Sequence, residues 1–302
     1  MSKNKVCICV LNFQSNKETL DLLNSLKSLT GDFEVYILEN GSSKFSFLKL
    51  DIPKGLNYSI AYYSSQKNLG FAGGNNYLLK KAQGLFDYFW LLNNDTLVYS
   101  ESLNELIKVF KIKKRAGLVG SLLLYPDNKT VWWCGSKVDL KRAKVLKKYF
   151  NKNKTEVPRK IFETDEITGT SMLISKEFIN QVGLMDESFF HTWEDTEYSL
   201  RGEKLGFKCY VSPKSVVIHK VGMSSGSEYS PLHMYYVERG RVLLMKKLGY
   251  FTAGSLLYLF PLWTKRILAP LVKKKSLTAL ISTVTGIMDG INETTGKKNF
   301  KS

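Results

Sequence analysis

The chain has 302 residues, of which 44% are hydrophobic and 13% are aromatic, so it can bury a substantial core. Its 44 Lys and Arg residues exceed its 27 Asp and Glu residues and give a formal charge of +17, which predicts an anionic partner such as nucleic acid, an anionic membrane surface or a phosphorylated ligand. No stretch reaches the roughly 20 apolar residues of a membrane-spanning helix, and no signal peptide is recognisable. We therefore expect a protein that is soluble or lies on a membrane without spanning it.

The first half alternates short apolar runs with amphipathic segments. This pattern predicts buried strands at Val6–Leu11, Glu34–Leu38, Ile60–Tyr63 and Tyr88–Leu92. Helices are predicted over Lys17–Leu29 and from a glycine-rich loop to about Gln83. Continuous apolar strands separated by helices indicate a mainly parallel sheet with both faces covered.

Polar residues follow each of these predicted strands. They are Asn12, Glu39, the loop Asn68–Asn76 and Asp95. Ligands of parallel sheets bind beyond the carboxyl ends of the strands, so we expect these residues to surround one site.

The second half begins with a strongly basic segment, Lys137–Lys160, which lacks periodicity and is predicted to be an exposed excursion. Strands are then predicted at Thr170–Ile174, Phe207–Val211 and Val216–Ile218, and helices at Lys176–Val182 and Asp195–Leu205. After Tyr229 the chain is predicted to be helical, with breaks near Gly249, Pro261 and Pro270.

A divalent cation is the first ligand that the sequence indicates. Asp95 follows a buried strand, and the amide of Asn93 stands two residues earlier. Mg²⁺ and Mn²⁺ take oxygen ligands and share their remaining positions with diphosphate oxygens and water. A capped turn before a helix from Ser102 is the alternative interpretation of the same residues.

The glycine-rich segment is the second candidate site. Asn68, Gly70, Gly73 and Asn75 precede or begin a helix, where glycines let the backbone approach a phosphate or ribose and the helix N-terminus favours anions. A tight strand-to-helix connection would use the same glycines, but the asparagines favour a ligand.

Acidic residues cluster immediately after the aromatic stretch Phe189–Trp193. Glu194, Asp195 and Glu197 are costly to bury unless they are used or paired. Adjacent helical residues point about 100° apart, so one of the first two can act as a base while the other meets a hydroxyl or a cation. An acidic helix N-terminus stabilised by the helix dipole is the alternative.

Three further residues are candidates for an anionic ligand. His219 follows a predicted strand, and Arg239 and Arg241 lie in a predicted helix, arginine being the side chain best suited to phosphate. A hydrogen-bonded structural histidine and a solvated helix face are the alternatives.

In this order, the segments resemble glycosyltransferase family 2 in its rhamnosyltransferase-like branch. The resemblance runs from about Lys5 to Arg241 and is most specific at Asn68–Asn76, Leu91–Thr96 and Gly183–Gly206. It implies the α/β GT-A fold, a Rossmann-like mixed, mainly parallel sheet flanked by helices, here with a C-terminal helical, basic, amphipathic extension. The expected catalytic domain spans residues 1–225, with a nucleotide-binding part to about 125 and an acceptor-binding part from about 126, and the extension spans 226–302.

The resemblance also implies roles for single residues. The nucleotide sugar is expected to meet Leu11, Phe13, Glu39, the glycine-rich segment, Asn94 and either Arg239 or Arg241, the arginine holding the diphosphate. The segment Asn93-Asn94-Asp95 occupies the position of the family's DXD motif, so Asp95 is expected to hold the metal together with Asn93 and His219. Asp195 matches the catalytic base of inverting members, with Glu194 beside it. Glu39 and Asn93 depart from the aspartates usual at their positions, which leaves the identity of the donor open.

The implied activity is inverting, Mg²⁺- or Mn²⁺-dependent transfer of a sugar in cell-surface polysaccharide synthesis. The resemblance favours rhamnose from dTDP-rhamnose as the donor and a saccharide or lipid-linked saccharide as the acceptor. The alternatives are a UDP-sugar-dependent transferase of the same family and a catalytically degenerate protein that only binds a nucleotide sugar.

The C-terminal region adds a prediction about a surface. From Arg241 to Ser302 there are eleven Lys and Arg residues against two Asp and Glu residues, and basic clusters alternate with leucine-rich and aromatic turns. Amphipathic basic helices bind anionic membranes, so we expect a peripheral protein at the cytoplasmic face of the cell membrane. Packing against its own domain or a partner subunit, as in a homodimer, is the alternative. No nucleic-acid-binding module is recognisable, so nucleic acid is not an expected partner.

Overall fold

The computed structural model describes residues 4–41, 52–221, 230–273 and 276–298. Its strands are β1 (Val6–Asn12), β2 (Phe33–Asn40), β3 (Ser59–Ser65), β4 (Tyr88–Leu92), β5 (Thr96–Val98), β6 (Ala116–Leu124), β7 (Val131–Trp133), β8 (Ser136–Asp139), β9 (Lys144–Lys147), β10 (Phe162–Thr164), β11 (Ser171–Ser175) and β12 (Lys208–His219). Its helices are α1 (Asn16–Leu26), α3 (Gly70–Ala82), α4 (Ser102–Ile112), α5 (Lys176–Val182), α6 (Glu194–Lys204), α7 (Pro231–Lys247), α8 (Ala253–Lys273) and α9 (Leu277–Ile291).

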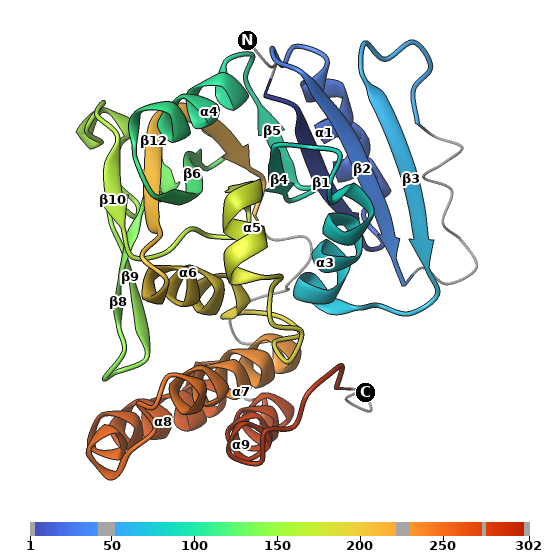
Figure 1. The fold of residues 1–302 in the computed structure, drawn as a ribbon. Helices are drawn as coiled ribbons and strands as arrows, with labels where there is room; N and C mark the ends of the chain where they lie inside the picture. Colours follow the sequence, from blue (N-terminus) through green and yellow to red (C-terminus); the bar gives the residue numbers. More distant parts are fainter. Residues whose placement is uncertain (1–3, 42–51, 222–229, 274–275, 299–302) are drawn as a thin grey trace.

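One mixed sheet forms the centre of the molecule, in the order β10-β12-β6-β11-β4-β1-β2-β3 (Figure 1). Strand β1 pairs in parallel with β2 and β4, β2 pairs in parallel with β3, and β12 pairs in parallel with β6. Strand β11 lies antiparallel between β4 and β6 and joins the two parallel halves. Strands β1, β4 and β6 are almost wholly buried because helices cover the sheet, which explains why their sequences are mainly apolar. The predicted fold class is confirmed.

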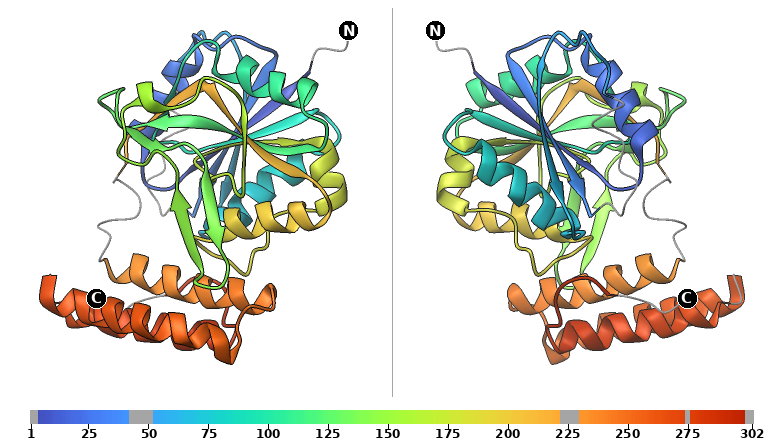
Figure 2. Two further views of the ribbon diagram at one scale, coloured as in Figure 1. Left: turned by 90° about the vertical axis from the view of Figure 1, so that its left-hand side faces the viewer. Right: turned by 90° about the vertical axis from the view of Figure 1, so that its right-hand side faces the viewer.

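The three C-terminal helices form a separate layer beyond the carboxyl ends of β2 and β3 (Figures 1 and 2). Helices α7 and α9 approach closely, since a Cβ atom at Gly286 would collide with the backbone of Tyr235. The β8–β9 hairpin reaches from the sheet toward this layer (Figure 2). No helix in the described part of the chain combines the length and the apolar character needed to cross a bilayer.

The structure corrects several predicted elements. The basic segment Lys137–Lys160 is not an irregular excursion, because it contributes most of the β8–β9 hairpin and a short 3₁₀ turn. The predicted glycine-rich loop is largely helical, since α3 begins at Gly70. The two predicted strands after Phe207 are one strand, β12, which a bulge between Ser212 and Val216 divides. Helix α8 continues through both prolines that were expected to break it.

Candidate active site

A cavity of about 190 Å³ lies where β1 and β4 end, and we call it the asparagine cavity after its five asparagines. Seven predicted residues line it: Leu11, Phe13, Asn68, Gly70, Asn75, Asn93 and Asn94. Its other walls are Ser15, Asn40, Phe71, Leu92, Phe190, His191, Leu232, His233 and Tyr236. The ends of β1 and β4, the start of α3 and the start of α7 therefore meet at one hollow, whereas Asn12, Glu39 and Asp95 do not line it.

Gly70 holds the entrance of α3 against the cavity wall. Its φ of +75° lies in the left-handed region, and a Cβ atom there would collide with the carbonyl oxygen of Phe190. The next residue, Phe71, donates its backbone N–H to the same oxygen at 2.9 Å. Gly73 lies one turn further on and does not line the cavity. The glycines thus serve close packing of α3 beneath the aromatic segment, and the asparagines supply the polar lining.

A buried hydrogen-bond network joins the ends of β1, β2 and β4. The amide of Asn12 donates to the Glu39 carboxylate at 2.8 Å and accepts a hydrogen bond from the Thr19 hydroxyl at 2.8 Å. Asn94 donates to the same hydroxyl at 3.0 Å. Glu39 is only 1% exposed and stands behind the cavity, and Asn94 both lines the cavity and anchors its floor. Binding roles for these two side chains stay predictions.

Asp95 and His219 form a buried pair at the end of β12. His219 Nε2 lies 3.3 Å from Asp95 Oδ2, while Asp95 Oδ1 and His219 Nδ1 are buried without a hydrogen-bond partner. Orphaned buried acceptors of this kind fit a divalent cation, whose missing positions a diphosphate and water would fill. No group of three or more His, Cys, Asp or Glu side chains in the described residues could enclose a metal by itself. The pair therefore suits a cation that arrives with its phosphate ligand.

The segment before α6 is held in a strained conformation. Thr192 and Trp193 have φ values of 68° and 72°, which side chains rarely adopt. The Trp193 indole fixes the segment by donating to the carbonyl of Val237 at 2.9 Å, and Gly240 leaves room for it, because a Cβ there would crowd the indole. In this conformation the Asp195 side chain lines a second cavity, and the Glu194 side chain is buried.

That second cavity measures about 460 Å³, and we call it the tryptophan cavity after Trp132, Trp133 and Trp193. Its other lining residues are Ala143, Lys144, Val145, Lys147, Glu166, Thr168, Thr192, Asp195, Thr196, Val237, Arg241 and Arg266. Asp195 accepts backbone hydrogen bonds from Gly169 at 3.0 Å and Thr196 at 2.8 Å, and burial raises its pKa. Burial and the Asp195 charge raise the pKa of Glu194 well above its usual value, and Glu194 lines neither cavity.

Glu166 is a site residue that the sequence analysis did not single out, although it follows Glu163 and Asp165 in a short acidic run before β11. Its carboxyl accepts hydrogen bonds from the hydroxyls of Ser136 and Thr196 and is 5% exposed. Burial, followed by the charge of Asp195, raises the pKa of Glu166 to about 7. Two carboxyls therefore share this cavity, and in Asp195 two backbone N–H groups partly offset the effect of burial on the pKa.

The Glu166 shift predicts a pH-dependent stability. In the unfolded chain the carboxyl loses its proton near its ordinary pKa of 4.5, whereas in the fold it keeps the proton to about pH 7. Its contribution is thus complete below pH 4.5 and is lost as the pH rises through 7. Between pH 5.5 and pH 8, the free energy of unfolding in urea should fall by about 1–2 kcal/mol more in the wild type than in Glu166→Gln. An equal pH dependence in both proteins would contradict the raised pKa.

Contacts between side chains link the two cavities, although no residue lines both. The Phe71 ring, which lines the asparagine cavity, packs against Gly169, whose N–H binds Asp195. Trp132 lines the tryptophan cavity and meets His219 edge-on, with ring centroids 4.4 Å apart. The Asp95 pair therefore contacts a wall residue of the cavity that holds Asp195.

The two predicted arginines lie apart. The Arg239 guanidinium is 1% exposed and donates to the carbonyl of Gly296 at 2.7 Å, so it faces the C-terminal segment. Arg241 lines the tryptophan cavity, donates to the carbonyl of Ala143, and pairs with Glu238 at 3.1 Å. Neither lines the asparagine cavity, and a diphosphate-binding role for either stays a prediction.

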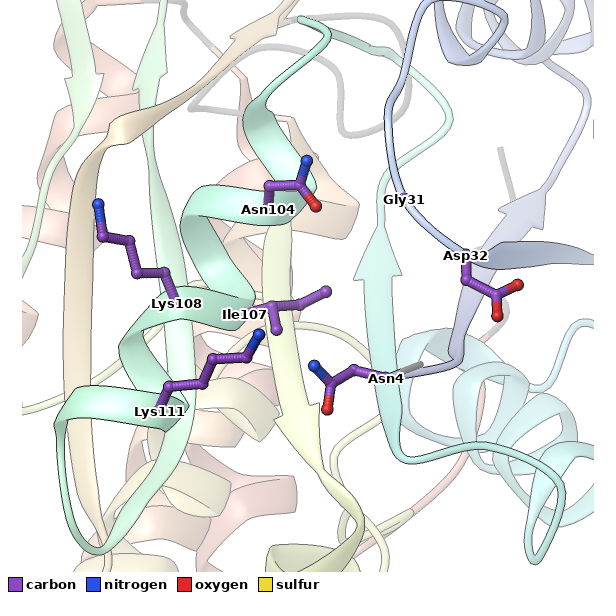
Figure 3. Close-up of a pocket in the computed structure, with 7 residues that line it drawn as sticks. All are labelled: Asn4, Gly31, Asp32, Asn104, Ile107, Lys108 and Lys111. Carbon is purple, nitrogen blue, oxygen red and sulfur yellow. The ribbon is translucent and has the colours of Figure 1, made fainter. Parts of the chain in front are cut away.

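A larger hollow of about 610 Å³ lies at the opposite end of the sheet (Figure 3). Asn4, Gly31 and Asp32 form one side, beside the amino ends of β1 and β2, and Asn104, Ile107, Lys108 and Lys111 of α4 form the other. It holds none of the predicted site residues. Volume alone therefore does not identify the site.

Comparison with solved structures identifies the fold. GalNAc-T7, solved with UDP, GalNAc and Mn²⁺, superposes with a TM-score of 0.64 at 14% identity over 96% of this chain and 55% of that chain. The mannosyltransferase PcManGT from Pyrobaculum calidifontis, solved with GDP-Man and Mn²⁺, superposes with a TM-score of 0.60 at 10% identity over 96% of this chain and 87% of that chain. The fold is that of the GT-A glycosyltransferases.

Sequence comparison identifies the family. Residues 6–183, more than half of the chain, match Glycosyl transferase family 2, and the chain belongs to this family. A dTDP-rhamnosyl transferase, RfbF of Shigella flexneri, is 30% identical over 93 residues, which are 28% of this chain and 31% of that protein. The match thus spans about a third of that relative. Over those 93 residues the chain is similar to a rhamnosyltransferase.

Proposed function

We propose that the protein transfers rhamnose from dTDP-rhamnose to a hydroxyl of a saccharide acceptor, with inversion at the anomeric carbon. The observation that carries the proposal is the contact from the Asp95 pair through Trp132 to the cavity that holds Asp195. The choice of donor rests on the likeness to RfbF. A UDP sugar is the alternative donor, because GalNAc-T7 was solved with UDP.

In this proposal the asparagine cavity receives the nucleoside and the tryptophan cavity receives the acceptor. Asp195 takes the proton of the acceptor hydroxyl while the hydroxyl oxygen attacks the anomeric carbon of the sugar. The bond between that carbon and the diphosphate oxygen breaks in the same step. Its raised pKa makes it a stronger base, and its two backbone hydrogen bonds aim it. A single displacement of this kind inverts the anomeric configuration.

Asp95 and His219 would hold Mg²⁺ or Mn²⁺, with Asn93 at the rim of the nucleotide cavity. A bound cation supplies positive charge against the negative charge that develops on the departing diphosphate. The buried pair would fix the position of the cation, because the Trp132 ring packs edge-on against His219.

A binding screen followed by product analysis tests the proposal. With Mn²⁺ present, dTDP should raise the melting temperature more than UDP or GDP, since a ligand that binds only the folded state stabilises it. Mass spectrometry should then show rhamnose released from dTDP-rhamnose or transferred to an added acceptor. Binding without turnover of any nucleotide sugar would indicate the degenerate binding protein, and no nucleotide binding would reject the function.

We further propose that the C-terminal layer rests on an anionic membrane at the cytoplasmic face, where it would reach a lipid-linked acceptor. Leu257 and Phe260 of α8 are 76% and 72% exposed, and α9 exposes an apolar stripe at helical spacing, Leu277, Ile281, Val284, Met288 and Ile291. Exposed apolar rows beside basic residues favour an anionic lipid surface. We also propose that the catalytic domain spans residues 1–225 and the C-terminal region spans residues 226–302.

Vesicle binding tests the membrane proposal. Leu257→Ser combined with Phe260→Ser should weaken binding to phosphatidylglycerol vesicles by about tenfold or more, because two apolar side chains lose their burial in lipid. Leu85→Ser, at an exposed position outside the C-terminal layer, is the matched control. Surface variants are preferable to truncation after Leu248, which would strip α9 from its packing on α7. Unchanged vesicle binding together with a shift from dimer to monomer would instead assign this face to a homodimer.

A further inference from the structure

The tryptophan cavity carries more positive charge than its own carboxylates balance. Four of its lining residues are cations: Lys144, Lys147, Arg241 and Arg266. Arg241 and Arg266 share one carboxylate, that of Glu238, at 3.1 and 3.0 Å. Glu238 is fully buried and also accepts a hydrogen bond from the Trp263 indole at 3.1 Å. Two guanidinium groups on one carboxylate leave a net positive charge, and both keep N–H groups directed elsewhere.

Lys147 is a cation of this cavity that contacts aromatic rings. Its ammonium lies 4.0 Å from the centroid of the Trp132 ring and 5.2 Å from that of Phe150, and the carboxyls of Glu166 and Asp195 act on it through space, without a hydrogen bond. The Lys147 side chain is exposed to solvent, and the protein atoms around it lower its pKa while the carboxyls of Glu166 and Asp195 act in the opposite direction. A cation held against aromatic rings is attracted to them, but the rings do not replace a hydrogen-bonding anion.

Neither carboxyl of the cavity is suited to neutralise Lys147. Asp195 is held by two backbone N–H groups and is the proposed base, and the raised pKa of Glu166, about 7, leaves it partly protonated at neutral pH. A lysine salt bridge would also lower the basicity that the reaction needs from Asp195. An anionic ligand could therefore provide the hydrogen-bonded partner of opposite charge that neither carboxyl of the cavity gives Lys147.

The position of these cations indicates which of the two substrates would bring the anion. The β8–β9 hairpin carries Lys147 on the side of Trp132, and Trp132 touches the His219 ring of the cation pair. Arg266 comes from α8 and Arg241 from α7, so two of the four cations belong to the C-terminal layer. A group bound there would share the cavity with Asp195, where the proposed function places the acceptor.

We propose that the tryptophan cavity binds a phosphate ester of the acceptor, with Lys147 as its main ligand and Arg266 as a second, and so sets the attacked hydroxyl against Asp195. The inference rests on the proposed function and names the chemistry of its acceptor. A phosphate ester suits the cavity better than a carboxylate, because its several oxygens match donors arriving from β9 and α8. The ester can belong to a saccharide phosphate or to a lipid diphosphate.

Binding of simple phosphates to the nucleotide-filled protein tests the proposal. The full chain is first saturated with dTDP and Mn²⁺, so that added phosphate cannot enter the donor's diphosphate site. Glucose 6-phosphate, glucose, glucuronate and geranyl diphosphate are then titrated while tryptophan fluorescence is followed, since three tryptophans line the cavity. Glucose 6-phosphate should bind at least tenfold more tightly than glucose or glucuronate, as expected for charge-assisted hydrogen bonds. Tighter binding of geranyl diphosphate than of glucose 6-phosphate would assign the ester to a lipid diphosphate, and the reverse to a saccharide phosphate.

Three variants assign the effect to Lys147. Lys147→Met should lower the affinity for the phosphates about tenfold and leave dTDP affinity unchanged, and Lys147→Arg should restore it. Lys148→Met is the matched control, because the adjacent Lys148 lies over the Phe162 ring and does not line the cavity. Equal phosphate affinity in Lys147→Met, or glucuronate binding as well as glucose 6-phosphate, would overturn the inference. Loss of dTDP affinity in Lys147→Met would also overturn it and move Lys147 to the donor. In each of these cases the rise in melting temperature caused by dTDP and Mn²⁺ still tests the proposed function separately.

Discussion

Asp195→Asn is expected to lower the rate of transfer by about 10² to 10⁴-fold while the dissociation constant of dTDP changes little. Asparagine has nearly the shape of aspartate, but it cannot take the proton of the acceptor hydroxyl. One of its two side-chain positions also turns from acceptor to donor, so it cannot satisfy both the Gly169 and the Thr196 N–H groups. Single-turnover transfer and calorimetric dTDP binding, measured on the same preparation, separate chemistry from binding.

The neighbouring acid provides the matched comparison. Burial holds the pKa of Glu194 well above its usual value, which favours its neutral form. Glu194→Gln replaces that carboxyl with a neutral group of similar shape and should keep most of the transfer rate. If Glu194→Gln were as inactive as Asp195→Asn, the base would be Glu194 or the pair would act as a unit. Full transfer by Asp195→Asn would place the base elsewhere.

Local pattern predicted the elements whose two faces are both buried. Strands β1, β2 and β4 are continuous apolar runs, and the sheet requires such runs wherever helices cover it. Strand β6 has the same character but went unrecognised, because Gly117 and Gly120 interrupt its run. Those glycines fill a packing need that only the fold shows, since Cβ atoms there would collide with Phe178 and crowd Ile167.

Residues that act across long sequence separations could not be predicted in the same way. The basic composition of the β8–β9 segment indicated exposure, but its Lys147 faces a cavity completed by Arg266, which comes from a helix more than a hundred residues later. Glu166 was not singled out, because its shifted pKa arises from Asp195 and burial rather than from its neighbours. By contrast, Asp95 and Asp195 were proposed as site residues, because each stands at the end or start of an element that a recognisable motif defines, and their roles stay predictions.

Asp95→Asn is expected to abolish the Mn²⁺-dependent part of dTDP binding. In the wild type, Mn²⁺ should increase dTDP affinity about tenfold or more, because the cation adds charge-assisted contacts to the diphosphate. The variant with Mn²⁺ should then bind dTDP as weakly as the wild type does with EDTA. Titration calorimetry with and without Mn²⁺ measures all four values.

The same substitution should act on stability in the opposite direction. Without a cation, Asp95 buries a carboxylate oxygen, Oδ1, that has no hydrogen-bond partner, which is costly. Asparagine removes the buried negative charge and keeps the side chain's shape, so the metal-free variant should melt at a higher temperature than the metal-free wild type. Asp127→Asn is the control, because that exposed carboxylate already accepts hydrogen bonds from Lys129 and Thr130 and should gain nothing. A variant that loses stability yet still binds dTDP more tightly with Mn²⁺ would show that Asp95 is a structural acid and that the cation is held by other residues.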